Sequence, residues 1–286
     1  MPELPEVETI CRDLQKNLPG LKIIDIIIND KRILKTIQRP AFIRKVAGKT
    51  IDLISRRGKM IVIVLKEGGN LLAHLGMTGQ LIYGEKLALK ETKVIFSLSD
   101  GRSLNYNDQR LFGRLSFVNE LSDDPLLKGI GPEPFEDAFN ENWIKSYAKR
   151  HQIPIKTLLL SQSFLAGIGN IYASEILFDA GINPQKPSSR LSSNEINALR
   201  ASTIRVLKEA IQYRGTSMRN YRDSNGEKGH FINRIKVYNK EHEPCPVCAR
   251  EIKRIVQSGR STFFCQSCQR STHSTRAVPK TEGAQG

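Results

Sequence analysis

The chain has 286 residues, of which 39% are hydrophobic and 26% are charged, a composition typical of a folded protein large enough for more than one domain. Lysine and arginine number 44 against 29 aspartate and glutamate residues, so the formal net charge is +15. This excess predicts a polyanionic partner, with nucleic acid as the first candidate. No apolar run approaches the length of a membrane span and no signal peptide precedes Glu3, so we expect a cytoplasmic protein with no membrane partner.

The chain begins Met1-Pro2-Glu3-Leu-Pro-Glu6, and removal of Met1 would leave the secondary amine of Pro2 as the amino terminus. An α-amino group has a pKa near about 7.7 to 8, so much of it can be neutral and nucleophilic at cell pH. A secondary amine that condenses with a carbonyl-like carbon gives an iminium, which is an electron sink. Pro2 is therefore a candidate nucleophile. The alternative is that Pro2 merely follows the start methionine and that Glu3 and Glu6 favour the start of a helix.

Periodicity predicts one leading helix followed by strands. Between residues 21 and 119, short β-branched runs alternate with turn residues, and Asp100-Gly101 between two of the runs indicates a hairpin, so we expect an antiparallel sheet or sandwich. The buried side of the helix, at three- and four-residue spacing, would consist of Val7, Cys11, Leu14 and Leu18. The expected strands are residues 23–28, 60–65, 71–75, 94–98 and 103–106.

A Gly/Pro-rich segment at residues 129–134 separates the strand pattern from a helical pattern. Gly167 and Gly169 precede one of the predicted helices, so its first backbone amides could hold a phosphate at the positive helix end. Asn170 could bind that phosphate or simply cap the helix. The expected helices are residues 142–149, 155–160, 171–179 and 193–213.

Four of the five cysteines form two C-x-x-C pairs on either side of residues 249–264. Such pairs can place four thiolates tetrahedrally around one zinc ion, whereas disulfides are not expected in a cytoplasmic chain. Because protein would fill all four positions, the ion would fold this segment and not catalyse. The fifth cysteine, Cys11, is expected in the core. The predicted zinc ligands are Cys245, Cys248, Cys265 and Cys268.

Three short groups in the strand region mix glycine with a cation or an apolar side chain. Lys59 and His74 could pair with phosphates, whereas Met77, Arg110 and Phe112 are of the kind that enters a duplex in place of an extruded base. The alternative is core packing for Met77 and Phe112, a solvated charge for Arg110 and a structural role for His74.

Arg260 lies between the two cysteine pairs, where the tip of a β-hairpin is expected. It could reach into the minor groove of DNA or stay a solvated charge. Six motifs in order, including this one, resemble those of the formamidopyrimidine-DNA glycosylase family, from Pro2 to about Gln269. The motifs that carry the resemblance are Pro2–Glu8, Arg57–Lys59, His74–Met77, Phe112-Gly113, Gly167–Glu175 and Gly259–Cys268.

The resemblance implies an α+β, multidomain fold with DNA bound in a cleft between two halves. Residues 1–130 would form an N-terminal antiparallel β-sandwich with a leading helix. Residues 131–235 would form a helix-two-turn-helix domain whose loop 216–230 caps the lesion. A four-cysteine zinc finger built on a β-hairpin would cover residues 236–270, with one structural zinc ion, and a disordered tail residues 271–286.

The same resemblance implies a monomeric enzyme that excises oxidised purines, such as 8-oxoguanine and formamidopyrimidines, from duplex DNA and cleaves abasic sites by β,δ-elimination. Pro2 would form a Schiff base with the sugar, Glu3 would be the acid and base, and Lys59 and Arg260 would bind phosphates beside the lesion. The DNA-binding residues would be His74, Met77, Arg110, Phe112, Lys156, Asn170 and Arg260, and the lesion pocket would include Glu6, Glu175 and Arg219.

Two other functions stay open on the sequence. One is an endonuclease VIII-like glycosylase for oxidised pyrimidines, against which the separate elements around Met77 and Phe112 argue. The other is a non-catalytic zinc protein that binds damaged DNA, which would leave the N-terminal proline and glutamate unexplained. The chain also departs from the family pattern at Gln109 and Leu111, where proline and a second arginine are often found.

Overall fold

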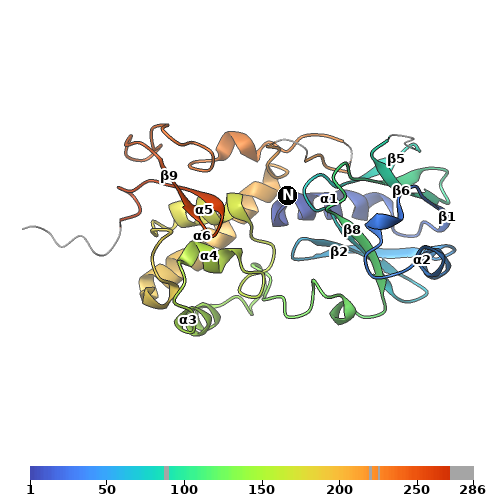
Figure 1. Cartoon of the computed structure of the whole chain (residues 1–286), viewed down its shortest axis with the longest axis horizontal. Coiled ribbons are helices and arrows are strands. Elements are labelled where there is room, and N and C mark those ends of the chain that lie inside the picture. Colours follow the sequence, from blue (N-terminus) through green and yellow to red (C-terminus); the bar gives the residue numbers. More distant parts are fainter. Residues whose placement is uncertain (87–89, 219–220, 225, 271–286) are drawn as a thin grey trace, which may run out of the picture.

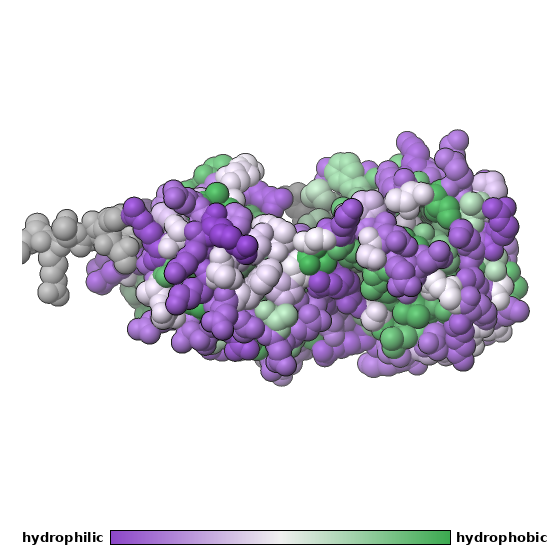
Figure 2. Space-filling view, turned by 90° about the horizontal axis from the view of Figure 1, so that it is seen from below, coloured by the Kyte–Doolittle hydropathy of each residue, from purple (hydrophilic) through white to green (hydrophobic). Residues whose placement is uncertain are grey.

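The computed structural model describes residues 1–86, 90–218, 221–224 and 226–270, and its two halves follow one another along the long axis of the molecule (Figure 1). Two sheets form one half, and helices with a β-hairpin form the other. Within these ranges no helix is both long and apolar enough to cross a membrane. Seen from below, the half with the sheets carries patches of hydrophobic surface, whereas the helical half is mainly hydrophilic (Figure 2).

The first half is the predicted antiparallel sandwich. One sheet has the strand order β1-β6-β7-β5 and the other β2-β3-β4-β8. Side chains alternate between the two faces of a pleated strand, so the inner faces of the two sheets supply one shared core. The strands are β1 (Ile23–Ile28), β2 (Ile51–Arg57), β3 (Met60–Leu65), β4 (Asn70–His74), β5 (Gln80–Gly84), β6 (Thr92–Leu98), β7 (Ser103–Asn107) and β8 (Arg114–Val118).

All five predicted strands are confirmed to within two residues at each end, and Asp100-Gly101 lies in the hairpin between β6 and β7. The sequence did not predict β2, β5, β8 or helix α2 (Arg39–Val46). Strand β2 lacks alternating burial and ends in two arginines, so its sequence carries no strand signal. Single-turn 3₁₀ helices complete the chain at Lys31–Ile33, Leu121–Asp123, Ser188–Arg190 and Phe231–Arg234.

The helical half confirms the four predicted helices around a second core. Ser192 caps the longest of them: its Oγ accepts a hydrogen bond from Glu195 N (3.3 Å), and the Glu195 carboxylate accepts one from Ser192 N (2.8 Å). The helices are α3 (Glu141–Lys149), α4 (Ile155–Leu160), α5 (Asn170–Asp179) and α6 (Ser193–Gln212). A hairpin of β9 (Lys253–Gln257) and β10 (Arg260–Phe264) follows.

Helix α1 (Leu4–Asn17) belongs to both halves. Its predicted apolar stripe, from Val7 to Leu18, packs into the sandwich core, whereas Leu4 packs into the core of the helical half. Burial of apolar surface in both cores therefore fixes the start of the chain at the boundary between the halves.

Candidate active site and DNA-binding surface

The carboxylate of Glu3 is held by the amino-terminal end of α5. Its Oε2 accepts hydrogen bonds from Gly169 N (2.8 Å) and Tyr172 N (3.3 Å), and its Oε1 accepts one from Ile171 N (2.9 Å). Unpaired N–H groups and the helix dipole make such a helix end a site for an anion. The prediction that these amides hold a phosphate is therefore wrong, because Glu3 occupies them. A Cβ on residue 169 would lie 2.4 Å from Glu3 Cδ, so the close approach of the Glu3 side chain to the backbone at this position requires glycine.

Glu6 lies buried beside Glu3. Its Oε2 accepts a hydrogen bond from Glu3 N (2.7 Å), and its Oε1 accepts from Tyr172 Oη (2.6 Å) and Thr216 N (2.8 Å). Burial and the neighbouring Glu3 raise the pKa of Glu6 to about 7. Only 2% of Glu6 is exposed, so its carboxylate contacts these protein groups and does not line the open surface.

A cavity of about 180 Å³ beside the chain start gathers residues that are distant in the sequence. Its lining includes Met1, Lys59, His74 and Arg260. Burial lowers the pKa of Lys59, which Glu3 opposes and Arg260 reinforces. A phosphate entering this cavity would meet several N–H donors and offset the repulsion between the cations. The structure thus brings together the chain start and three of the predicted phosphate-binding residues.

A carboxylate that the sequence analysis missed fixes the turn before Lys59. Glu133 Oε1 accepts hydrogen bonds from Gly58 N (2.6 Å) and Arg57 Nη1 (2.9 Å), and Glu133 Oε2 pairs with Arg56. Because Glu133 lies in the segment between the halves, it joins that segment to the β2–β3 turn. Its only sequence signal is an acidic residue within a Gly/Pro-rich linker.

His74, at the end of β4, has a neutral ring that accepts a hydrogen bond. Its Nδ1 accepts a hydrogen bond from Gly76 N (3.2 Å), which leaves the proton of the neutral ring on Nε2. Burial lowers the pKa of His74 to about 4, and the nearby cations Lys59 and Arg114 contribute to this shift. His74 could therefore donate to a phosphate oxygen but would not add a positive charge.

Met77, Arg110 and Phe112, which we call the wedge, meet at the surface of the sandwich half. The guanidinium carbon of Arg110 lies 4.5 Å from the Phe112 ring centroid, and Arg110 Nη1 lies 3.7 Å from Met77 Sδ. Met77 is 46% exposed and Phe112 is 56% exposed, so neither is a core residue. Large apolar side chains that project in this way are suited to enter a base stack.

Lys156 and Asn170 contact the zinc-finger hairpin. Lys156 Nζ donates to Asn170 Oδ1 (2.6 Å), Ser261 O (2.9 Å) and Thr262 Oγ1 (2.7 Å), and Asn170 Nδ2 donates to Ser261 O (3.0 Å). Burial lowers the pKa of Lys156 to about 8, and Arg260 contributes to this shift. Lys156 is 0% exposed, so its prediction as a direct DNA contact is corrected: it joins α4 and α5 to the hairpin. Asn170 is partly exposed.

Glu175 is a structural residue that binds the backbone of a neighbouring segment. Its carboxylate accepts hydrogen bonds from the backbone N–H groups of Lys236 (2.8 Å), Val237 (2.9 Å) and Tyr238 (2.8 Å) and is buried. These contacts hold the segment that leads to the zinc finger, so the placement of Glu175 in the lesion pocket is corrected. Arg219 and residues 271–286 lie outside the described residues.

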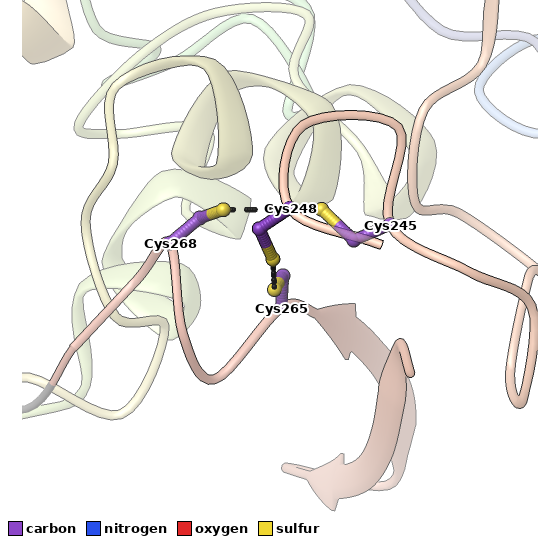
Figure 3. A group of neighbouring side chains, drawn as sticks. All are labelled: Cys245, Cys248, Cys265 and Cys268. Atoms are coloured by element: carbon purple, nitrogen blue, oxygen red, sulfur yellow. Dashed lines mark hydrogen bonds between the residues drawn. The ribbon is translucent and has the colours of Figure 1, made fainter. Parts of the chain in front are cut away.

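The four paired cysteines converge as predicted (Figure 3). Their Sγ atoms all lie within 4.8 Å of one another, with 3.8 Å between Cys245 and Cys268 and 3.5 Å between Cys248 and Cys265. Tetrahedral ligation with Zn–S distances of about 2.3 Å requires sulfur separations of about 3.8 Å. The donor set therefore fits one zinc ion. The hairpin above it places Arg260 directly after the turn at Ser258-Gly259.

Comparison with known proteins places this architecture in one family. The family model of the formamidopyrimidine-DNA glycosylase N-terminal domain matches residues 1–115, that of its H2TH domain residues 130–222, and that of a zinc finger found in FPG and IleRS residues 243–270. A formamidopyrimidine-DNA glycosylase of Desulforamulus reducens is 42% identical over 275 residues, covering 94% of this chain and 99% of that protein.

Solved structures agree with this assignment. The MutM (Fpg) protein of Thermus thermophilus matches with a TM-score of 0.85 and 37% identity, over 94% of this chain and 98% of that one. A Lactococcus lactis Fpg complex with abasic-site DNA matches with a TM-score of 0.87 and 35% identity, over 94% and 100%. The fold is that of a zinc-finger DNA glycosylase. More particularly, the chain belongs to the formamidopyrimidine-DNA glycosylase family.

The low pKa of His74 predicts a pH-dependent stability difference between the wild-type protein and His74→Asn, which keeps an acceptor for Gly76 N. The unfolded histidine titrates near 6.5 and the folded one near 4, so the unfolded chain binds the proton first. The contribution of His74 is fully present above pH 6.5 and is lost as the pH falls through 4, by up to about 3 kcal/mol. Urea unfolding across this range measures it. A difference between the proteins that does not change with pH would contradict the shift.

Removal of zinc should abolish DNA binding while the sandwich stays folded. The ion holds the hairpin that carries Arg260 and that supplies two partners of the buried Lys156 ammonium, so its loss would disorganise both. Elemental analysis should find one zinc per chain in the wild type and in the control Cys11→Ser, and less in Cys248→Ser. Full DNA affinity in zinc-free Cys248→Ser would contradict this role.

Proposed function

We propose that this protein excises oxidised purines from duplex DNA and cleaves the resulting abasic site, with Pro2 as the nucleophile. The observation that carries the proposal is the Glu3 carboxylate, fixed on α5 next to the chain start and to a cavity lined by Lys59, His74 and Arg260. The structures of Lactococcus lactis Fpg that resemble this chain contain DNA with an abasic site or a Fapy-dG lesion. Nothing in this scheme requires chemistry at the zinc.

Binding would begin with electrostatic attraction between cations of the protein and phosphates of the DNA. Cations around the cavity neutralise phosphates, the duplex bends, and the wedge replaces a nucleotide that leaves the stack. Extrusion costs a few kcal/mol, and less for a damaged base, which favours lesions over normal pairs. Asn170 and Arg260 would hold phosphates that flank the extruded nucleotide.

The chemistry would then follow at the sugar. Burial lowers the pKa of the Met1 amino group, while Glu3 and Glu6 oppose this shift. With Met1 removed, an α-amino group on Pro2 has an ordinary pKa of about 7.7 to 8, so part of it is neutral at cell pH. The Pro2 amine attacks C1′, the damaged base leaves, and the sugar ring opens to an iminium with Glu3 as proton donor and acceptor. Loss of a C2′ proton expels the 3′ phosphate, and a second elimination removes the 5′ phosphate.

We also propose that the protein acts as a monomer in the cytoplasm. The chain start, the wedge, the cavity cations and the zinc site all come from one chain, so a second copy is not needed to complete the site. Sedimentation of the protein alone and on a lesion duplex would test this stoichiometry.

Borohydride should trap a covalent complex between the wild-type protein and lesion-containing duplex DNA, because an iminium is reduced to a stable amine. Peptide mapping should place the bond on Pro2, and mass spectrometry should show that Met1 is absent. A duplex without damage is the matched control and should give no adduct. Trapping on Lys59, or a retained Met1 in active protein, would overturn the assignment of the nucleophile.

Glu3→Gln should bind lesion DNA almost as tightly as wild type while releasing base roughly 10² to 10⁴ times more slowly, the range expected for a lost acid–base group. Single-turnover excision and equilibrium binding measure the two effects separately. Glu67→Gln, a remote exposed carboxylate, is the control and should behave as wild type. An unchanged excision rate in Glu3→Gln would remove the role given to Glu3.

A further inference from the structure

The three wedge side chains contact one another in the structure. Arg110 stacks on Phe112 at 4.5 Å and reaches Met77 Sδ at 3.7 Å, although all three side chains are exposed. Exposed side chains normally sample several rotamers, and ordering them costs conformational entropy. Their shared arrangement therefore depends on the backbone that presents them.

Leu111 gives that backbone its shape. Its φ is 57°, in the left-handed region that side chains other than glycine, asparagine and aspartate rarely adopt. Leu111 is also the residue of this loop that packs against the sandwich core, while its neighbours Gln109, Arg110 and Phe112 are exposed. A strained backbone conformation persists only where surrounding contacts stabilise it. Here the packing of the Leu111 side chain against the sandwich core stabilises it.

Hydrogen bonds fix both ends of the same loop. Asp108 Oδ2 accepts from Gly113 N (2.8 Å), Asp108 Oδ1 accepts from Arg110 N (3.2 Å), and Thr78 Oγ1 also accepts from Arg110 N (3.1 Å). On the other side, a Cβ on Gly76 would lie 2.5 Å from Gly113 N, so the loop that carries Met77 packs backbone against backbone. Between these fixed ends, Leu111 anchors the tip of the loop to the sandwich core.

We propose that Leu111 is a positioning residue that locks the wedge in its DNA-inserting shape before DNA binds. The inference rests on the proposed function for what the wedge does, but the lock itself is a property of the free protein. A loop that is ordered in advance spends little conformational entropy during base displacement, so more of the binding free energy remains to extrude the lesion. Leu111 touches no reacting atom.

Three variants separate the effect of the Leu111 backbone conformation from that of its apolar side chain. Leu111→Asn tolerates the left-handed backbone but removes the apolar anchor, and Leu111→Gly frees the backbone as well. Leu111→Met keeps an apolar side chain of similar volume and is the matched control. Thermal unfolding of each should stay close to wild type, because the side chain is only partly buried.

Hydrogen exchange in the free protein tests the lock without any reaction. We expect the amides of Arg110 and Gly113 to exchange at least about tenfold faster in Leu111→Asn and Leu111→Gly than in wild type. Loss of the apolar anchor would raise the fraction of molecules in which the loop is locally open, and exchange follows that fraction. Leu111→Met should exchange as wild type does. Unchanged protection of both amides in Leu111→Asn and Leu111→Gly would overturn the proposal.

Kinetics test the consequence. Excision of 8-oxoguanine paired with cytosine should slow by about tenfold in Leu111→Asn and Leu111→Gly, because a paired base must be displaced. Cleavage of a preformed abasic site, where no base is displaced, should change by less than about twofold. Equal losses on both substrates, or no loss on either, would reject a positioning role. If the wild type excises no lesion, the proposed function fails. Hydrogen exchange would still test whether Leu111 holds the wedge loop in place.

Discussion

The structure depends on one electrostatic contact, the Glu3 carboxylate on the amino-terminal N–H groups of α5. A helix end buried between two domains needs an anionic or acceptor partner, because its first N–H groups have none within the helix. Glu3 meets that need from the chain start, at the boundary between the halves. The contact therefore closes the boundary between the halves and holds the chain start, with Glu6 and Tyr172 behind it. The same contact therefore contributes to stability and fixes the position of the chain start.

The cavity beside this contact holds charge that the free protein does not fully compensate. Lys59 has a lowered pKa and His74 stays neutral, both mainly because burial disfavours their charged forms. Groups perturbed in this way often mark functional sites, since a ligand of opposite charge relieves the penalty. Glu133 fixes the turn that carries Lys59, and the zinc-finger hairpin fixes Arg260. Lys59 and Arg260 are therefore held beside one cavity by contacts with distant parts of the chain.

Most elements and the metal site were predictable because they are local properties. Helix and strand periodicity identified every helix from α3 to α6, and the cysteine spacing identified the metal site. Strand β2 and helix α2 were not predicted, since one lacks alternation and the other is short and basic. Strand β2 and helix α2 are stabilised by tertiary contacts that the local sequence pattern does not reveal. The wedge residues were identified by type, but their mutual contacts were not.

By itself the sequence determined the residue types and their order: a proline and two glutamates at the chain start, paired cysteines, and a family resemblance that the comparisons bear out. Only the tertiary structure decided which partners those residues have. Glu3 and Gly169 are 166 positions apart, and Lys156 and Thr262 are 106 apart, so no local period relates them. Burial and hydrogen bonding are set by packing between distant segments. That is why Lys156 and Glu175 are structural here although the family resemblance implied direct roles.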